Sequence, residues 1–174
     1  MKNRIIYNIL VILMMKNQPF YAEGLCFSCI RCSACCRHES GYVFLSETDV
    51  SRLAAACKIT YTEFVERYCR WIPSTPLNSS EYKSERLSLK EKSDFDCIFW
   101  DSGCKVYHSR PLQCKAFPFW PTVLNFKKSW EKIKAGCPGM DQGKLHKKEE
   151  IEALLHIQAA EPVLTRKAQN TGRW

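Results

Sequence analysis

"CIRCSACC", residues 29–36, places four cysteines within eight positions. The first three have the CxxCxxC spacing that is common among metal ligands. The fourth, Cys36, directly follows Cys35. Because neighbouring side chains of an extended segment leave the backbone in different directions, we expect strain if both sulfurs bind one ion. The pair therefore predicts two metal centres, or two edges of one larger cluster.

The whole chain contains eleven cysteines in 174 residues. Hydrophobic residues make up 45% and charged residues 25%, which is typical of one globular domain. Disulfide scaffolds and metal sites both produce such cysteine counts. The odd count, the adjacent Cys35 and Cys36, and a length sufficient for a core without cross-links favour metal ligands over disulfides.

The first 22 residues carry conflicting signals. Lys2 and Arg4 precede an apolar run over residues 9–15, the order found in a signal peptide. Phe20, however, stands where cleavage requires a small residue, and the run is too short to span a bilayer. We expect residues 1–22 to be a leader or a mis-assigned start outside the fold, with a signal peptide as the alternative. The expected protein is cytoplasmic, without a stable membrane span, and its thiols stay reduced.

Two helix starts are visible after the cysteine run. Ser46 is a good N-cap, and Asp49 lies in the first turn of the helix that it opens. Thr60 and Glu63 have the spacing of a capping box, which predicts a second helix. Proline at position 73 is expected to end that helix.

The remaining pattern predicts short strands and a last helix. Residues 42–45 and 86–89 are typical of strands, and residues 97–100 and 104–107 of the two arms of a β-hairpin. Residues 147–161 form an amphipathic helix, followed by a frayed tail. The expected fold class is α+β: a small single domain of short helices and a β-hairpin, organised around a cysteine-ligated metal centre.

The other cysteines fall into two groups. Cysteines at turns and hairpin ends, where bent backbone can aim several sulfurs at one point, are Cys97, Cys104, Cys114 and Cys137. Cys57 and Cys69 lie in the two predicted helices, and we interpret them as small buried hydrophobic residues. Cys26 precedes Cys29 by three residues and is a secondary candidate ligand.

"CIRCSACC", "VFLSETDV", "CIFWDSGCKVYHSRPLQCKAFPFWP" and "CPGM" occur in that order, and together they resemble the YkgJ-like CxxCxxCC family. The family is described as a zinc- or iron-chelating domain, and some members carry names suggesting iron–sulfur oxidoreductases. The resemblance covers about residues 23–142 and implies a chelating domain there, with residues 143–174 as a C-terminal helix and tail. The metal ligands that it implies are Cys29, Cys32, Cys35, Cys36, Cys97, Cys104, Cys114 and Cys137. Tyr107, Arg110, Pro111 and Pro118 match further positions of the family pattern.

The cysteine spacing favours iron–sulfur over zinc. Structural zinc sites commonly show two CxxC pairs, a form that this chain lacks. CxxCxxC opens the ligand run of bacterial ferredoxins, in which the remaining ligand precedes a proline, as Cys137 does here. A [4Fe–4S] cluster on Cys29, Cys32, Cys35 and Cys137 is one concrete arrangement. A second site on Cys36, Cys97, Cys104 and Cys114 would use the other four ligands, although zinc remains the alternative metal.

Several residues near these cysteines have other roles to be weighed. His38 and His108 could replace a thiolate, but we interpret both as ordinary exposed or hydrogen-bonded histidines. Arg110 is expected to anchor its loop by donating to a carbonyl, with a cluster sulfur as the alternative acceptor. The aromatic block of residues 117–120 is expected in the core.

The sequence leaves three classes of function open. The first is a redox or cluster-dependent protein, such as an iron–sulfur enzyme acting with a protein partner, although no catalytic motif is visible. The second is a structural zinc module that binds protein or RNA, suggested by the lysines over residues 127–148 and the net charge of +8. The third is a metal carrier or sensor.

Overall fold

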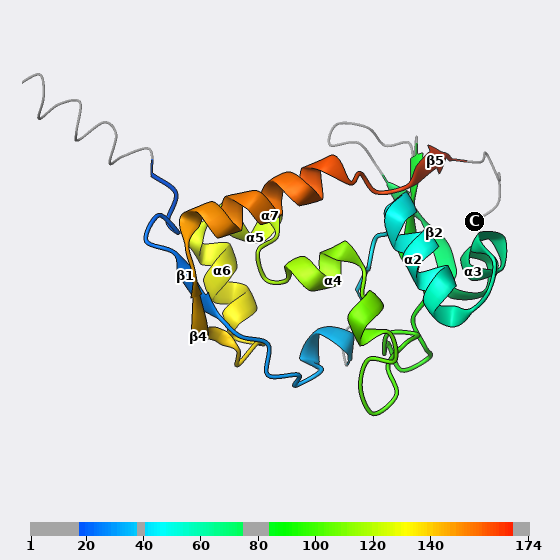
Figure 1. Cartoon of the computed structure of the whole chain (residues 1–174), viewed down its shortest axis with the longest axis horizontal. Helices are drawn as coiled ribbons and strands as arrows, with labels where there is room; N and C mark the ends of the chain where they lie inside the picture. The colour runs from blue at the N-terminus through cyan, green and yellow to red at the C-terminus, as the bar shows by residue number, and fades with distance from the viewer. Residues whose placement is uncertain (1–17, 38–40, 75–83, 169–174) are drawn as a thin grey trace, which may run out of the picture.

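The computed structural model describes residues 18–37, 41–74 and 84–168 of the chain. The described residues form two lobes with separate hydrophobic cores. Helix α4 (Leu112–Ala116) lies between the lobes, and helix α7 (Lys148–Ala160) runs along one side from one lobe to the other (Figure 1). The mixture of short helices and antiparallel strands confirms the predicted α+β class.

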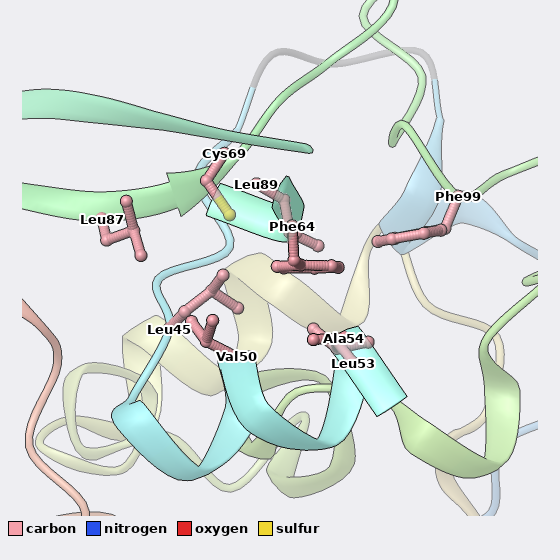
Figure 2. Close-up of a cluster of buried hydrophobic side chains, with 9 residues drawn as sticks. All are labelled: Leu45, Val50, Leu53, Ala54, Phe64, Cys69, Leu87, Leu89 and Phe99. Atoms are coloured by element: carbon pink, nitrogen blue, oxygen red, sulfur yellow. The ribbon is translucent and has the colours of Figure 1, made fainter. Parts of the chain in front are cut away.

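The first lobe, called here the sheet lobe, packs two helices on a three-stranded antiparallel sheet. Its elements are α2 (Glu47–Cys57), α3 (Tyr61–Tyr68), β2 (Cys69–Ser74), β3 (Ser84–Leu89) and β5 (Thr165–Lys167). The strand order is β2-β3-β5, with β3 in the centre. Figure 2 shows Leu53 and Ala54 of α2 below the Phe64 ring of α3. Phe64 in turn stacks on Phe99 at 6.1 Å, which joins the cysteine-bearing segment to this core.

Both predicted helix starts are confirmed. The Ser46 hydroxyl accepts a hydrogen bond from the Asp49 backbone N–H, while the Asp49 carboxylate accepts one from the Ser46 N–H. Thr60 and Glu63 form the same reciprocal box at the start of α3. These boxes satisfy backbone donors that a helix start leaves without partners.

The predicted end of the second helix and the predicted strand over residues 42–45 need correction. Helix α3 ends at Tyr68, not near Pro73, and the chain turns directly into β2. Pro73 lies in β2 at the edge of the sheet, where a missing N–H removes no ladder hydrogen bond toward the interior. Residues 42–45 form a single antiparallel bridge, Phe44 to Ser88, because this short segment runs beside the end of β3 only.

The predicted hairpin over residues 97–107 is also reduced to one bridge, between Trp100 and Cys104. The Asp101 N–H donates to the Gly103 carbonyl, so the turn lies where it was predicted. Tyr107, expected in a strand, begins the 3-10 turn η2 (Tyr107–Ser109). The first arm pairs instead with the segment after β3, through a bridge from Cys97 to Glu91 and a hydrogen bond from the Ile98 N–H to the Lys90 carbonyl at 3.2 Å.

The second lobe, called here the helical lobe, surrounds a two-stranded antiparallel sheet with short helices. Its elements are β1 (Leu25–Phe27), α5 (Pro121–Leu124), α6 (Lys127–Lys134), β4 (Met140–His146) and the first half of α7. Its core consists of Tyr21, Phe119, Val123, Leu124, Trp130, Met140 and Ile151. The burial of Phe119 confirms the aromatic block as core. Tyr21 is buried here, although it lies within the predicted leader.

Ser28 ties the start of the cysteine run to the far end of the chain. Its N–H donates to the Gly139 carbonyl at 3.1 Å, and its hydroxyl accepts from the Lys144 N–H at 2.9 Å. Gly143 has a φ of +74°, and a Cβ there would collide with the Ser28 side chain. Glycine at position 143 therefore lets β4 approach the residue before Cys29.

Helix α7 and β5 join the two lobes. The Gln158 amide donates to the Phe119 carbonyl at 2.9 Å in the helical lobe. At the other end, Glu161 accepts from the Ser46 hydroxyl at 3.0 Å, and the Leu164 N–H donates to the Leu45 carbonyl at 2.8 Å. The segment after Pro162 was predicted to fray, but strand β5 pairs with β3. That pairing depends on residues far away in the sequence.

We predict that Gly143→Ala lowers the free energy of unfolding by about 2–4 kcal/mol, from left-handed backbone strain and overpacking against Ser28. Chemical denaturation measures the change. Gly136→Ala is the matched control, because its nearest contact would be at 3.8 Å. Equal stabilities of the two variants would contradict the role assigned to Gly143.

Candidate metal centre

Three segments from distant parts of the sequence bring cysteines together between the lobes. Residues 28–36 cross from the helical lobe toward the sheet lobe and end in the 3-10 turn η1 (Ala34–Cys36). Residues 97–114 leave the sheet lobe and lie beside η1 (Figure 1). The Cys97 N–H donates to the Cys36 carbonyl at 2.8 Å, so these two segments are in direct backbone contact. Cys137 lies in the turn between α6 and β4.

Five thiols form one neighbourhood at this crossing: Cys35, Cys36, Cys97, Cys104 and Cys114. The Cys35 and Cys36 sulfurs are 3.9 Å apart. Cys36 interacts electrostatically with Cys97 and Cys114, and Cys114 interacts with Cys97, Cys35 and Cys104. On the opposite side, Cys137 interacts with Cys32 and Cys35. Cys35 is therefore the thiol shared by both sides.

The thiols of this neighbourhood ionise unequally. The hydrogen bond with the Cys36 thiol lowers the pKa of Cys35 to about 6, and Arg110 adds to the effect. The same bond, together with burial, raises the pKa of Cys36. Burial also raises the pKa of Cys97 and of Cys114, and neighbouring thiols increase both shifts. A group of adjacent, partly buried thiols resists carrying several negative charges unless a cation is added.

Cys35 interacts with members of both predicted ligand sets. Cys29, Cys32 and Cys35 are exposed. Across residues 18–37, 41–74 and 84–168, no three cysteine, histidine, aspartate or glutamate side chains already form a coordinating group. The ligand set thus stays a prediction.

The adjacent pair does not diverge as predicted. Residues 34–36 form a 3-10 turn instead of an extended segment, and this turn brings the two sulfurs to 3.9 Å. Arg31 and Ser33, both with positive φ, set up the tight turn. The 3.9 Å spacing is compatible with one shared ion, with two metals of one cluster and with two separate sites.

Arginines surround the crossing. Arg31 and Arg110 both lie over the Tyr107 ring, at 4.4 and 3.8 Å from its centroid. Arg110 also donates to the Tyr107 carbonyl at 3.0 Å, which confirms its predicted role in anchoring the loop. Arg37 stacks on Trp100 at 3.9 Å and pairs with the buried Asp96. These cations favour negative charge on nearby sulfurs.

Helix α2 holds the segment before Cys114 through residues whose role the sequence did not reveal. The buried Asp49 carboxylate accepts from the Leu112 N–H at 2.9 Å and pairs with Arg52. Arg52 donates to the Arg110 carbonyl at 3.0 Å. A capping carboxylate with this second function gives no separate sequence signal, because its partner lies 63 positions away.

Gln113 provides the next anchor. Its side chain accepts from the Phe44 N–H at 2.9 Å and donates to the Tyr42 carbonyl at 2.7 Å. Its own carbonyl accepts from the Trp120 indole at 2.7 Å. The residue before Cys114 is thereby fixed to both lobes.

The remaining candidates lie away from the crossing or outside the described part. His108 is exposed and contacts the Tyr107 ring edge-on at 5.6 Å, whereas His38 lies outside the described residues. Cys69 is buried in the sheet-lobe core, Cys57 packs against it, and burial raises the pKa of Cys69 to about 12. Cys26 pairs with Leu145 in the β1–β4 ladder.

The donor set fits a thiophilic metal. Soft thiolates select zinc and iron–sulfur clusters, and a cation would offset the cost of ionising the buried thiols. The Trp100 indole N–H, between Cys97 and Cys104 in the sequence, is buried without an acceptor. A cysteine-rich crossing of this kind, held by two small cores, defines a metal-binding protein of the cysteine-cluster class.

The chain belongs to the CxxCxxCC family, described as "Putative zinc- or iron-chelating domain", which matches residues 28–138. Metal binding is thus supported by the family as well as by the donor set. The chain is also 31% identical over 121 residues to "Uncharacterized protein MJ0661" of Methanocaldococcus jannaschii, covering 66% of this chain and 58% of that protein. No solved structure matches. Among the described helices, none combines the length and apolar character needed to cross a bilayer.

We predict that Asp49→Ala destabilises the protein by about 3 kcal/mol, since it leaves the Leu112 and Ser46 N–H groups and Arg52 without their acceptor. Hydrogen exchange should also show faster exchange of the Leu112 amide. Asp101→Ala, which removes an exposed pair with Lys105, should leave stability close to that of the wild type. An unchanged Leu112 amide in Asp49→Ala would exclude the proposed anchor.

Proposed function

We propose that the chain holds an iron–sulfur centre with a redox or cluster-dependent role. The observation that carries the proposal is the convergence of five thiols from segments separated by some sixty residues in sequence. Their anchors come from both lobes, so the crossing is a built feature and not an accidental contact of two loops. A metal bound there would supply electron transfer or Lewis-acid chemistry.

Iron–sulfur is favoured over zinc by the spacing of the cysteines, because the chain lacks the two CxxC pairs that are common in structural zinc sites. The crossing gathers five thiols and has Cys32 and Cys137 at its side, more than one four-ligand site uses. Cys35 interacts with both groups, so the two proposed centres would lie next to each other. The Cys137-Pro138 pair provides the remote ligand typical of a ferredoxin-like run.

The proposed ligands remain the eight cysteines of the family pattern. One centre would use Cys29, Cys32, Cys35 and Cys137. The second would use Cys36, Cys97, Cys104 and Cys114. The exposed position of Cys29 and Cys32 requires that residues 29–32 close over the first centre when metal binds. Metal binding and local folding are then coupled.

A structural zinc module that binds protein or RNA is the alternative. Its support is the lysine-rich stretch over residues 127–148. Several of those lysines are paired with acids, including Lys134 with Asp141 and Lys144 with Glu150. Pairing reduces the positive field available to phosphates, and so favours the iron–sulfur proposal over RNA binding.

Metal identity is tested by purifying the protein anaerobically and measuring iron, acid-labile sulfide and zinc together with the visible spectrum. We expect equal amounts of iron and sulfide, and a broad visible absorption at about 400 nm like that of other protein-bound clusters. Colourless protein with stoichiometric zinc would support the structural alternative. Protein that takes up neither metal, even after reconstitution, would refute metal binding.

The ligands are tested by single Cys→Ser variants. Cys97→Ser and Cys114→Ser should each lose at least half of the bound iron, since each removes a thiol of the crossing. Cys57→Ala and Cys69→Ala are matched controls from the sheet-lobe core and should keep full metal content, although Cys69→Ala costs stability. Loss of iron from the control variants would show that the ligand set is misassigned.

The adjacent pair needs its own comparison. If two centres exist, Cys35→Ser should chiefly affect the centre shared with Cys32 and Cys137, and Cys36→Ser the one shared with Cys97 and Cys114. Electron paramagnetic resonance of the reduced variants would distinguish the two losses. Identical residual spectra in both variants would replace the two-centre arrangement with a single centre.

A further inference from the structure

Three described side chains keep a buried nitrogen without a hydrogen-bond acceptor: Arg70, Arg86 and Trp100. The two arginines use the rest of their guanidinium groups, because Arg70 pairs with Glu91 and Arg86 stacks on Phe44 at 4.0 Å. Trp100 has only its Nε1–H, so its whole donor capacity is unused. Buried donors are nearly always satisfied in native proteins, and this indole therefore indicates an acceptor that the polypeptide itself does not supply.

The backbone places Trp100 among the cysteines. Trp100 is directly opposite Cys104 in an antiparallel bridge, and residues opposite each other project their side chains to the same face. The backbone N–H of Trp100 donates to the Cys97 carbonyl at 2.8 Å, which holds Trp100 in the same tight turn. Cys97 and Cys104, the two proposed ligands nearest to Trp100 in sequence, thus flank it along this turn.

Arg37 adds a link to the other cysteine segment. Its guanidinium lies 3.9 Å from the centroid of the Trp100 ring, and it directly follows Cys36. The cation draws electron density of the ring toward its face, which strengthens the indole N–H as a donor. Arg37 also pairs with the buried Asp96, so its position over the ring is fixed from the sheet-lobe side.

We infer that the Trp100 indole N–H donates a hydrogen bond to a sulfur of the metal-loaded centre, and that Trp100 is a positioning residue for that centre. A metal-bound thiolate is a charged acceptor and binds a donor more strongly than a neutral thiol does. The inference rests on the proposed metal site but not on the identity of the metal. Sulfur is the acceptor under either zinc or iron loading.

The expected effects follow from the charge on sulfur. A donated hydrogen bond spreads that charge and keeps the thiolate from being protonated or displaced, so its loss should weaken metal binding about tenfold or more. In an iron–sulfur centre it favours the more negative, reduced state. Its removal should therefore lower the reduction potential.

The test compares Trp100→Phe with Trp71→Phe. Phenylalanine at position 100 keeps a ring under Arg37 and removes only the N–H and one ring of the indole. Trp71 is the matched control, because its ring also lies under an arginine, Arg166 at 4.4 Å, but in strand β2 outside the segments that carry the proposed ligands. Zinc is the probe, since thiolate sites accept it and it is diamagnetic.

Two measurements are made on full-length protein: zinc affinity by chelator competition, and the ¹⁵N-indole spectrum before and after zinc is added. We expect the Trp100 indole proton to shift downfield on loading and to exchange more slowly with solvent. We expect Trp100→Phe to lose at least tenfold in affinity while Trp71→Phe stays within twofold of wild type. Thermal melting of the zinc-free variants shows whether a loss reflects folding alone.

The outcomes separate this inference from the proposed function. If wild-type protein binds zinc and Trp100→Phe matches it, with an unshifted indole signal, the inference is overturned and the metal site stands. The inference is also overturned if Trp100→Phe loses affinity but the Trp100 indole signal of the wild-type protein does not respond to zinc. If wild-type protein binds neither zinc nor iron, the proposed function falls, and the inference falls with it.

Discussion

The hydrogen bond from the Cys97 N–H to the Cys36 carbonyl is the contact on which the cysteine crossing depends. It joins two segments that consist mostly of irregular backbone. The ion pair between Arg37 and Asp96 repeats the same link one residue after Cys36 and one residue before Cys97. Together they bring Cys36 and Cys97 into register, and the other thiols of the crossing follow from the turns on either side.

Neither segment could hold that register alone, because irregular backbone must be fixed by groups outside itself. The sheet lobe supplies Asp49, which binds the residues before Cys114, and the helical lobe supplies the strand that binds Ser28. Gln113 connects to both sides. Each of the two small cores thus holds one end of the cysteine-bearing segments in place.

Local features of the fold could be predicted from the sequence, and distant pairings could not. The Ser46 and Thr60 capping boxes are confirmed because each depends on residues three positions apart. Strand β2, the β1–β4 ladder and β5 were missed, since each forms only against a partner far along the chain. For the site, the cysteine pattern identified candidate ligands. The unpaired indole of Trp100 could emerge only from three-dimensional packing.

The pairing of β1 with β4 also has a consequence for how the chain folds during synthesis. The cysteine run follows β1 immediately, yet the strand that fixes it is made more than a hundred residues later. Domains fold as they emerge, from the amino terminus onward, so residues 29–36 stay open to solvent until most of the chain has been translated. A metal bound by the proposed ligands in this run would therefore be able to enter before the β1–β4 ladder closes.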